Sequence, residues 1–298
     1  MKTENKVEKF YERLGRPSGD FSLKRRQQDV LFDKKWLRFL KLSHFFRHLP
    51  FIDFILGAGS MALGNVHQDS DFDVIVGAKS GRIFTARFFC ILMFGLLGRR
   101  RHAKRGYLPR SAGRQKLSHR EAASNKICFN HFVTPRSYCL KPPHNIYWRE
   151  LYQNLVPIYG RKEKIREFFE ANNWMGERIY PVRSSAKFSG FSTNESEFAC
   201  GSNFSKKKAL LKTSNGVYSD DLRHGFYEPS FIASILEKML SGRFGDFIER
   251  ILKQIQIKRI KKSPKDSLGF EPRMVFNNDE LEFHPDTLRI HKLLSDEK

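Results

Sequence analysis

The sequence predicts an α+β fold, in which a small mixed β-sheet is flanked by helices and followed by a C-terminal helical region. Three short apolar segments are typical of buried strands, namely 51–56, 74–76 and 126–133. Longer segments in which apolar residues recur at helical spacing lie around them, at 23–48, 82–97 and from Pro229 onward. This order of segments indicates a sheet with helices packed against it.

The first predicted helix covers residues 23–48. Its apolar residues share one side of a helix: Val30, Leu31, Trp36, Leu37, Phe39, Leu40 and Phe45. Pro50 ends the helix because proline cannot continue one, and the strand 51–56 follows directly.

The predicted helix over 82–97 is almost entirely apolar, and Ser80 is in position to cap its N-terminus. A membrane-spanning helix needs about 20 apolar residues. This segment is shorter, and Arg87 interrupts it. We therefore predict a helix buried against the sheet, and a membrane is not an expected partner.

Composition divides the chain into four parts. They are an N-terminal extension (1–22), a folded domain (23–183), a flexible linker or insertion rich in Ser, Gly, Asn and Lys (184–228), and a C-terminal helical region (229–298).

Further elements are expected inside two of these parts. The folded domain contains two more predicted helices, over 145–157 and 161–171. The C-terminal region opens with one long amphipathic helix after Pro229 and continues into a strand or extended segment from Arg273 to Phe283.

The chain of 298 residues has 54 Lys and Arg against 32 Asp and Glu, which gives a formal net charge of +22. A protein this basic attracts polyanions such as nucleic acid, nucleotides or an anionic membrane, although general solubility is an alternative reason for the charge. The four cysteines form no Cys-x-x-Cys pair and no zinc-like spacing, and the N-terminal residues contain no apolar signal segment. These features predict a reducing, cytoplasmic setting.

The segment 51–76 carries the most specific pattern in the chain. Asp71 and Asp73 stand one residue apart at the start of a strand, so their side chains share one face of it. Two such carboxylates can hold a hard divalent cation. Gly59 lets the backbone approach a phosphate closely, and Ser60 begins a helix whose N-terminal amides favour an anion.

Gly59-Ser60, followed after ten residues by Asp71-Phe-Asp73 between apolar strands, resembles the signature of the polymerase β nucleotidyltransferase superfamily. Segments 126–133, 151–159 and 283–286 are similar to segments of uncharacterised bacterial nucleotidyltransferase-domain proteins. The resemblance implies a nucleotidyltransferase fold, an NTP as substrate and Mg²⁺ or Mn²⁺ on Asp71 and Asp73. It also implies that Gly59 and Ser60 contact the β- and γ-phosphates, and it selects no acceptor.

One departure from the resemblance concerns the third carboxylate, which active members carry on a later strand. The expected strand, 126–133, offers Asn130 and His131 but no Asp or Glu. Asn130 is the candidate third catalytic residue, although an amide is a poor general base. His131 can act as a base near neutral pH, or it is an ordinary polar residue at a strand end. Strand alternation predicts that these two side chains point to opposite faces.

Basic side chains near the motif are candidates for further phosphate contacts. Arg82 and Arg87 lie on the predicted helix after the second strand, and we assign them to nucleotide binding. The segment 99–120 contains nine Lys and Arg and no acid. It is either a solvated loop or a flap near the aspartates that binds phosphate or nucleic acid through Arg99, Arg100, Arg101, Lys104 and Arg105.

The leading hypothesis is a metal-dependent enzyme that moves a nucleoside monophosphate from an NTP to an acceptor. The alternative is a catalytically silent nucleotide- or RNA-binding protein that retains the fold, which the amide at Asn130 and the net charge support. A membrane-surface interaction protein, based on residues 82–105, is a third hypothesis.

Overall fold

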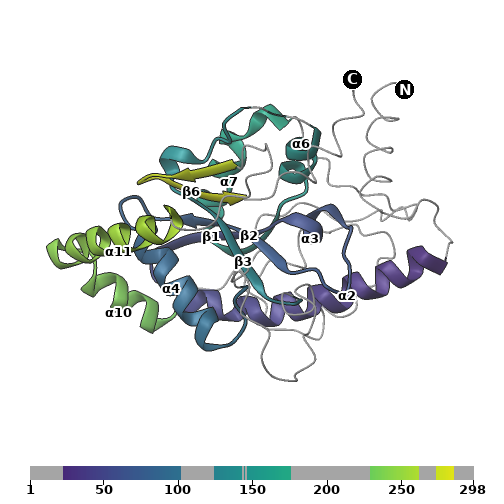
Figure 1. The fold of residues 1–298 in the computed structure, drawn as a ribbon, viewed down its shortest axis with the longest axis horizontal. Coiled ribbons are helices and arrows are strands. Elements are labelled where there is room, and N and C mark those ends of the chain that lie inside the picture. Colours follow the sequence, from purple (N-terminus) through teal and green to yellow (C-terminus); the bar gives the residue numbers. More distant parts are fainter. Residues whose placement is uncertain are drawn as a thin grey trace, which may run out of the picture.

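The computed structural model describes residues 23–101, 124–142, 144, 146–175, 229–261 and 273–284 (Figure 1). The predicted N-terminal extension (1–22) and the predicted linker (184–228) lie outside the described residues. In the described part, a six-stranded mixed sheet lies between two layers of helices. The predicted α+β class is therefore confirmed.

The strands stand in the order β4-β1-β2-β3-β6-β5 across the sheet. Only β2 and β3 are parallel, and every other neighbouring pair is antiparallel. The bounds are β1 (Ile52–Gly57), β2 (Phe72–Ala78), β3 (Ile127–Val133), β4 (Val156–Gly160), β5 (Arg273–Phe276) and β6 (Glu280–His284). The strands β1, β2 and β3 correspond to the three apolar segments that the sequence analysis identified as strands.

One face of the sheet packs against α2 (Leu23–Ser43) and α4 (Ile83–Leu96). The predicted helix over 23–48 ends in a 3-10 turn, η1 (His44–His48), ahead of Pro50. Trp36 and Phe39 are fully buried in this core, and the Phe39 ring stacks on Phe72 of β2 with ring centroids 4.9 Å apart. Fully burying side chains of this size stabilises a fold by about 1.5–3 kcal/mol each, so this layer contributes much of the core energy.

The opposite face packs against α3 (Gly59–Leu63), α6 (Ile146–Gln153) and α7 (Lys162–Ala171), with 3-10 turns η2 (Pro135–Ser137) and η3 (Asn173–Met175) nearby. Phe54 of β1 contacts the ring of Phe168 on α7 at a centroid distance of 5.3 Å. This second core covers the sheet over β1 and the C-terminal ends of β2 and β3. It leaves the start of β2 for polar side chains.

The prediction of a helix over 145–157 is wrong at its C-terminal end. The helix α6 stops at Gln153, and residues 156–160 form the edge strand β4, which pairs with β1. Pro157 lacks a backbone N–H and is tolerated on an edge strand, where the missing donor costs no hydrogen bond in the sheet interior.

The C-terminal part contributes helices and strands. The prediction of one long helix after Pro229 is wrong, because the chain turns at residues 240–242 and forms α10 (Phe231–Met239) and α11 (Arg243–Lys261). The Ser230 hydroxyl caps α10 by accepting from Ala233 N at 3.3 Å. The strands β5 and β6 join the sheet beside β3, so residues 273–284 complete the domain predicted over 23–183 rather than a separate helical region.

Candidate active site

The candidate site lies where β2 begins, next to the turn that follows β1. Asp71 directly precedes β2 and Asp73 is its second residue. Phe72 and Val74 point into the core under α2 and α4, so Asp73 points to the opposite face. The backbone N–H of Ala58 donates to Asp73 O at 2.9 Å. This hydrogen bond holds the end of β1 against the start of β2.

Gly59 lies directly against the Asp73 side chain. Its φ is +59°, a conformation that glycine adopts at little cost. A Cβ atom at position 59 would lie 2.8 Å from Asp73 Cγ, closer than non-bonded carbon atoms normally approach. The sequence analysis expected Gly59 to allow a close approach to a phosphate. In the structure, the group that lies close to Gly59 is the carboxylate of Asp73. Ser60 follows in α3 and is half-buried.

Arg101 brings a positive charge to the pair of carboxylates. Its Nη1 lies 2.5 Å from Asp71 Oδ2. The backbone positions this side chain, since Arg101 N donates to Ile127 O at 2.9 Å and Ile127 N donates to Arg99 O at 2.7 Å. Of the five basic residues predicted to bind nucleic acid, Arg101 is the one that contacts Asp71; Lys104 and Arg105 lie outside the described residues.

Asn130, the candidate third catalytic residue, lies next to Asp73. Its Nδ2 donates to Asp73 Oδ1 at 3.2 Å. The thiol of Cys128 donates to Asn130 Oδ1 at 2.6 Å, which orients the amide nitrogen toward Asp73. Potential ligand atoms of Asp71, Asp73 and Cys128 lie within 4.8 Å of one another.

The prediction that Asn130 and His131 point to opposite faces is wrong, because β3 has a bulge at this point. The register with β2 shifts between Phe129 and His131, so Asn130 is the extra residue. Phe129 and Phe132, three residues apart, both point into the core under α4. The two residues between them therefore lie on the face that carries Asp73.

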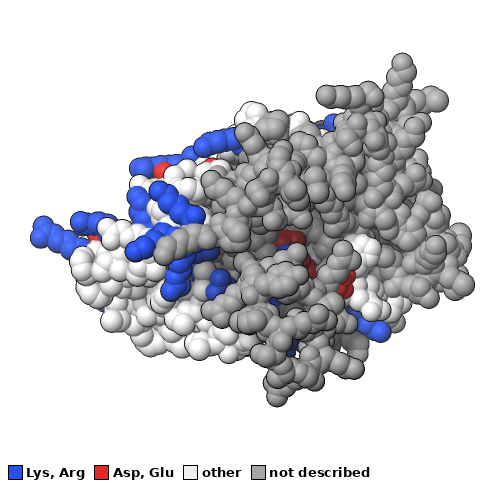
Figure 2. Space-filling model, in the orientation of Figure 1, with Lys and Arg blue, Asp and Glu red and all other residues white. Residues whose placement is uncertain are grey.

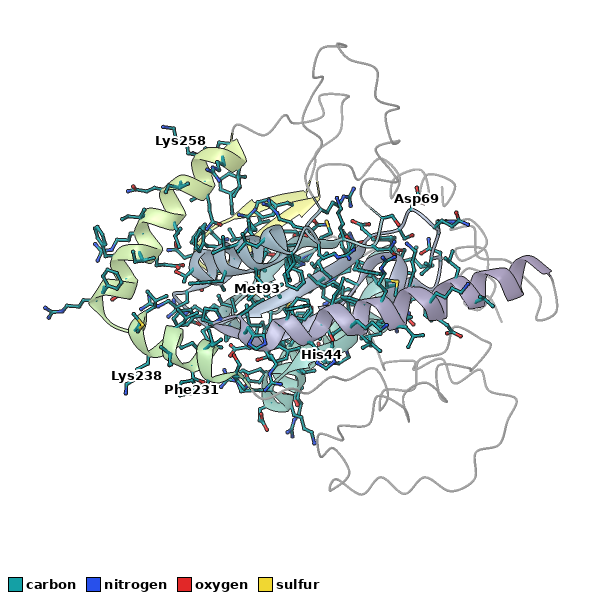
Figure 3. All side chains as sticks on the ribbon, turned by 90° about the horizontal axis from the view of Figure 1, so that it is seen from below. His44, Asp69, Met93, Phe231, Lys238 and Lys258 are labelled. Atoms are coloured by element: carbon teal, nitrogen blue, oxygen red, sulfur yellow. The ribbon has the colours of Figure 1, made fainter. Side chains whose placement is uncertain are left out.

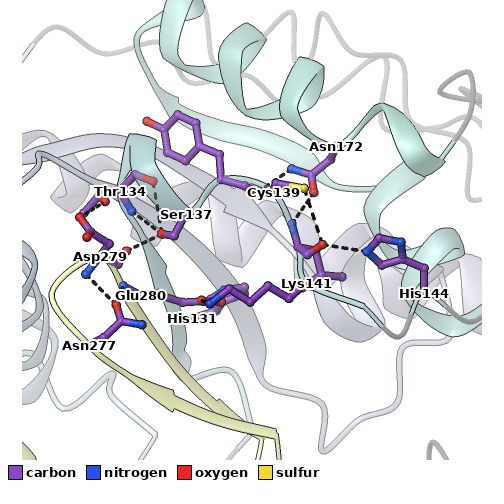
Figure 4. A network of polar contacts seen from close by, with 12 residues as sticks. His131, Thr134, Ser137, Cys139, Lys141, His144, Asn172, Asn277, Asp279 and Glu280 are labelled. Atoms are coloured by element: carbon purple, nitrogen blue, oxygen red, sulfur yellow. Dashed lines mark hydrogen bonds and ion pairs between the residues drawn. The ribbon is translucent and has the colours of Figure 1, made fainter.

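On that face His131 belongs to a second buried polar cluster (Figure 4). Its Nε2 lies 3.7 Å from Glu280 Oε1, and Lys141 Nζ lies 3.6 Å from Glu280 Oε2. Glu282 is the neighbour of His131 in the pairing of β3 with β6, and both glutamates are buried. Sequence reasoning missed this cluster because β6 is remote in the chain; the alternation of Glu280 and Glu282 with apolar Leu281 was the available signal.

The pKa of Asp73 lies above that of an ordinary aspartate. Burial raises the pKa of Asp73 to about 7, the charge of Asp71 adds to the rise, and Arg101 opposes it. Burial, together with the same two aspartates, also raises the pKa of the Cys128 thiol well above its usual value. The thiol therefore stays protonated and acts as a hydrogen-bond donor, and oxygen atoms are the ligands that the site offers.

Lys35 of α2 is a member of the site that sequence reasoning missed. Its Nζ donates to Ser70 O at 2.6 Å, directly before Asp71. Burial lowers its pKa to about 8, and Asp69 and Asp71 act in the opposite direction. The signal was present, because Lys35 falls on the buried side of the helix, three residues after Phe32 and four before Phe39.

The structure does not bring Arg82 and Arg87 to the aspartates. Both belong to the α4 layer on the other side of the sheet. Arg82 Nη2 pairs with Asp246 Oδ1 of α11 at 2.6 Å, and Arg87 Nη1 donates to Gln256 Oε1 of the same helix at 2.7 Å. These arginines hold α11 against α4, which corrects their assignment to nucleotide binding.

Comparisons with protein-family models, curated proteins and solved structures found no match for this chain. Among the described helices, none combines the length and the apolar character that crossing a membrane requires. Cys90, Cys128 and Cys139 are free thiols in the described part of the chain.

Replacing Asp73 with asparagine is expected to stabilise the metal-free protein at pH 8. The pKa of Asp73 is raised from a usual value of 3.8 to about 7, so between these values the folded protein binds more protons than the unfolded chain. The wild-type free energy of unfolding should therefore fall as the pH rises through this range. One pKa unit corresponds to about 1.4 kcal/mol, and the gain from Asp73→Asn at pH 8 should exceed that value.

Urea unfolding in the presence of EDTA at several pH values between 4 and 8 measures this effect. Gln68→Ala, at an exposed and non-titrating position of the same loop, is the control and should keep the wild-type pH dependence. If Asp73→Asn keeps it as well, Asp73 does not titrate in this range.

Proposed function

We propose that this chain is a metal-dependent nucleotidyltransferase, which moves a nucleoside monophosphate from an NTP to an acceptor. The observation that carries the proposal is the packing of Asp73 against Gly59, with Asp71 and Asn130 beside it. This arrangement supports the resemblance stated from the sequence, since the residues that carry the resemblance are also neighbours in space.

The side chains fit a hard divalent cation, Mg²⁺ or Mn²⁺. Asp71 and Asp73 offer carboxylate oxygens, which are the ligands such ions prefer. Burial and, after it, the charge of Asp71 raise the pKa of Asp73, and a bound cation would counteract both by stabilising the carboxylate. The guanidinium of Arg101 on Asp71 indicates that this carboxylate already accepts a positive neighbour. When bound, the ion would neutralise charge on the phosphates and lower the pKa of the attacking hydroxyl.

The other residues of the site have separate tasks in this proposal. The backbone at Gly59 and Ser60 binds the terminal phosphates. Arg101 exchanges Asp71 for a phosphate oxygen when the nucleotide enters, because a guanidinium matches both groups. Lys35 stabilises the loop before Asp71 by donating a hydrogen bond to Ser70 O. The proposed setting is the cytoplasm, in agreement with the free thiols.

A catalytically silent nucleotide- or RNA-binding protein is the second candidate function. Two observations favour it, namely the amide of Asn130 in the position of a third carboxylate and the ion pair that occupies Asp71. An amide does not accept a proton at neutral pH, so this site lacks an evident base for the acceptor hydroxyl.

Calorimetric titration of the full chain with NTPs, with and without Mg²⁺ or Mn²⁺, tests the binding. Asp71→Asn/Asp73→Asn should weaken metal-dependent binding at least about 10-fold, since two ligand carboxylates are lost. Glu163→Gln/Glu170→Gln, which removes two exposed carboxylates of α7, is the matched control and should bind as the wild type does. Equal binding by wild type and double variant would show that the site is elsewhere.

Transfer of a labelled α-phosphate separates the two candidate functions. Nucleic-acid 3′ ends, small hydroxyl compounds and the protein itself are offered as acceptors. Metal-dependent binding with label transfer identifies the enzyme, whereas binding without transfer to any acceptor class identifies the silent protein.

A further inference from the structure

The outer side of α10, α11 and α4 exposes an unusual amount of apolar surface. Phe231 is 79% exposed, Met239 63% and Phe244 60%. With Val30 of α2 as the one exception, all large apolar side chains that are exposed in the described residues belong to these helices or to the residue after α4: Phe88, Leu92, Leu96, Leu97, Phe231, Ile232, Ile235, Met239, Phe244, Phe247, Ile251 and Ile255. We call this set the apolar patch. Water-soluble monomers rarely expose so many apolar side chains together.

Helical spacing gathers part of the apolar patch into one stripe. On α11 the exposed residues Phe244, Phe247, Ile251 and Ile255 are three or four positions apart. The opposite side of α11 carries Gln256, whose Nε2 donates to Phe84 O at 2.8 Å. The helix is thus held to the domain partly by polar contacts, while large apolar side chains face outward.

The acids of α10 and α11 are all engaged with the domain. Glu237 accepts from Phe51 N and Lys79 Nζ, both at 2.6 Å. Glu249 accepts from the N-terminus of α4, at 2.9 Å from Phe84 N and 2.8 Å from Thr85 N. Asp246 pairs with Arg82. Two of the three acidic residues of these helices are therefore in ion pairs, and Glu249 is held by hydrogen bonds to the N-terminus of α4.

Basic side chains remain around the apolar patch. The exposed ones on α10 and α11 are Lys238, Arg243, Arg250, Lys258, Arg259 and Lys261. Figure 3 shows Phe231, Lys238 and Lys258 on the outer side of the two helices. In Figure 2, Lys and Arg gather over α11, and almost no acidic side chain is visible over α10 and α4. The surface therefore combines exposed apolar groups with a positive rim.

The nature of the partner follows from this combination. A second copy of the chain would place two equally basic surfaces against each other, which costs energy. A nucleic acid would satisfy the Lys and Arg side chains but would leave most of the apolar patch in water. The interface of an anionic bilayer accepts both, because lipid phosphates face the basic groups and the acyl region takes the apolar ones.

We propose that α10 and α11, together with the exposed side of α4, bind the surface of an anionic lipid membrane. The apolar patch enters the boundary between headgroups and acyl chains, and Lys238, Arg250 and Lys258 lie at the level of the lipid phosphates. The site face of the sheet is on the other side of the α4 layer, so the protein can bind a membrane and keep the aspartates accessible.

Co-sedimentation of the full chain with vesicles tests this surface. Vesicles of neutral phosphatidylcholine are compared with vesicles that contain phosphatidylserine as well. Binding should require the anionic lipid and should weaken in high salt. Phe231→Gln/Phe244→Gln/Phe247→Gln should reduce partitioning at least about 10-fold, because three apolar anchors are removed. Val30→Gln, at the exposed apolar residue outside the apolar patch, is the matched control.

A second variant tests the rim. Lys238→Gln/Arg250→Gln/Lys258→Gln should reduce partitioning about 5-fold for each charge, since a basic residue near an anionic surface contributes about 1 kcal/mol. Circular dichroism confirms that each variant is folded before it is compared.

Three results would overturn the proposal. They are wild-type binding to neutral and anionic vesicles alike, equal partitioning of the phenylalanine variant and the wild type, and an absence of vesicle binding. In the last case, dimerisation that the phenylalanine variant abolishes would assign the apolar patch to a second copy. Binding of single-stranded RNA that only the rim variant weakens would assign the rim to nucleic acid.

Discussion

Gly59→Ala should lower the free energy of unfolding by about 2–5 kcal/mol and should abolish metal-dependent nucleotide binding. An L-residue at φ +59° costs about 1–2 kcal/mol. The added Cβ would also lie 2.8 Å from Asp73 Cγ, and overpacking of this kind costs about 1–3 kcal/mol. The backbones of β1 and β2 are paired in the sheet interior and resist a shift. The Asp73 side chain is therefore the group that moves, and it moves away from Asn130 and Asp71.

Gly81→Ala is the matched control for this substitution. Gly81 has a φ of +73°, and a Cβ there would meet nothing within 4 Å. This variant should lose only the conformational part, about 1–2 kcal/mol, and should bind metal and nucleotide as the wild type does. Urea unfolding and calorimetry measure both quantities. Equal stability losses in the two variants, with nucleotide binding intact, would show that Asp73 does not depend on Gly59.

Asn130→Asp should convert the site into one with three carboxylates. The Asn130 amide lies 3.2 Å from Asp73, so a carboxylate at position 130 would add a ligand within reach of the same cation. We expect tighter Mg²⁺ binding and a transfer rate about 10²–10⁴ times higher, the range that a general base contributes. Without metal, crowding of like charges should raise the carboxyl pKa values and lower stability at neutral pH.

Asn130→Ala is the control, because it removes the amide without adding a charge. It should leave the transfer rate low and should not tighten metal binding. Single-turnover transfer and Mg²⁺ titration compare the three proteins. If Asn130→Asp behaves as Asn130→Ala does in both assays, residue 130 plays no part in metal binding or proton transfer.

The parts of the site that are local in sequence were predictable. Alternation along one strand is sufficient to put Asp71 and Asp73 on one face, and the glycine before a helix marks a close approach. Asn130 and His131 were also identifiable as the polar candidates of the strand 126–133, but the sequence left open which of them faces the aspartates. The bulge at Asn130 was not, because a bulge depends on how two strands pair and leaves no reliable pattern in one of them.

The roles of the arginines could not be read from proximity in the sequence. Arg82 and Arg87 follow the second strand closely, yet their partners are Asp246 and Gln256, more than 150 residues later. Arg101 contacts Asp71 because its backbone lies beside Ile127 of β3. The packing of helices and strands decides which partner an arginine contacts. The residues next to that arginine in the sequence do not determine this packing.

By itself, the sequence determined the α+β class, the three central strands and the carboxylate pair beside a glycine. These features follow from hydrophobic periodicity and backbone preference, which act over a few residues. Only the tertiary structure decided that residues 273–284 complete the sheet beside β3, that Glu280 and Glu282 meet His131, and that α11 directs apolar side chains outward. Such outcomes depend on contacts between distant segments, whose free energy exists only when the chain is folded.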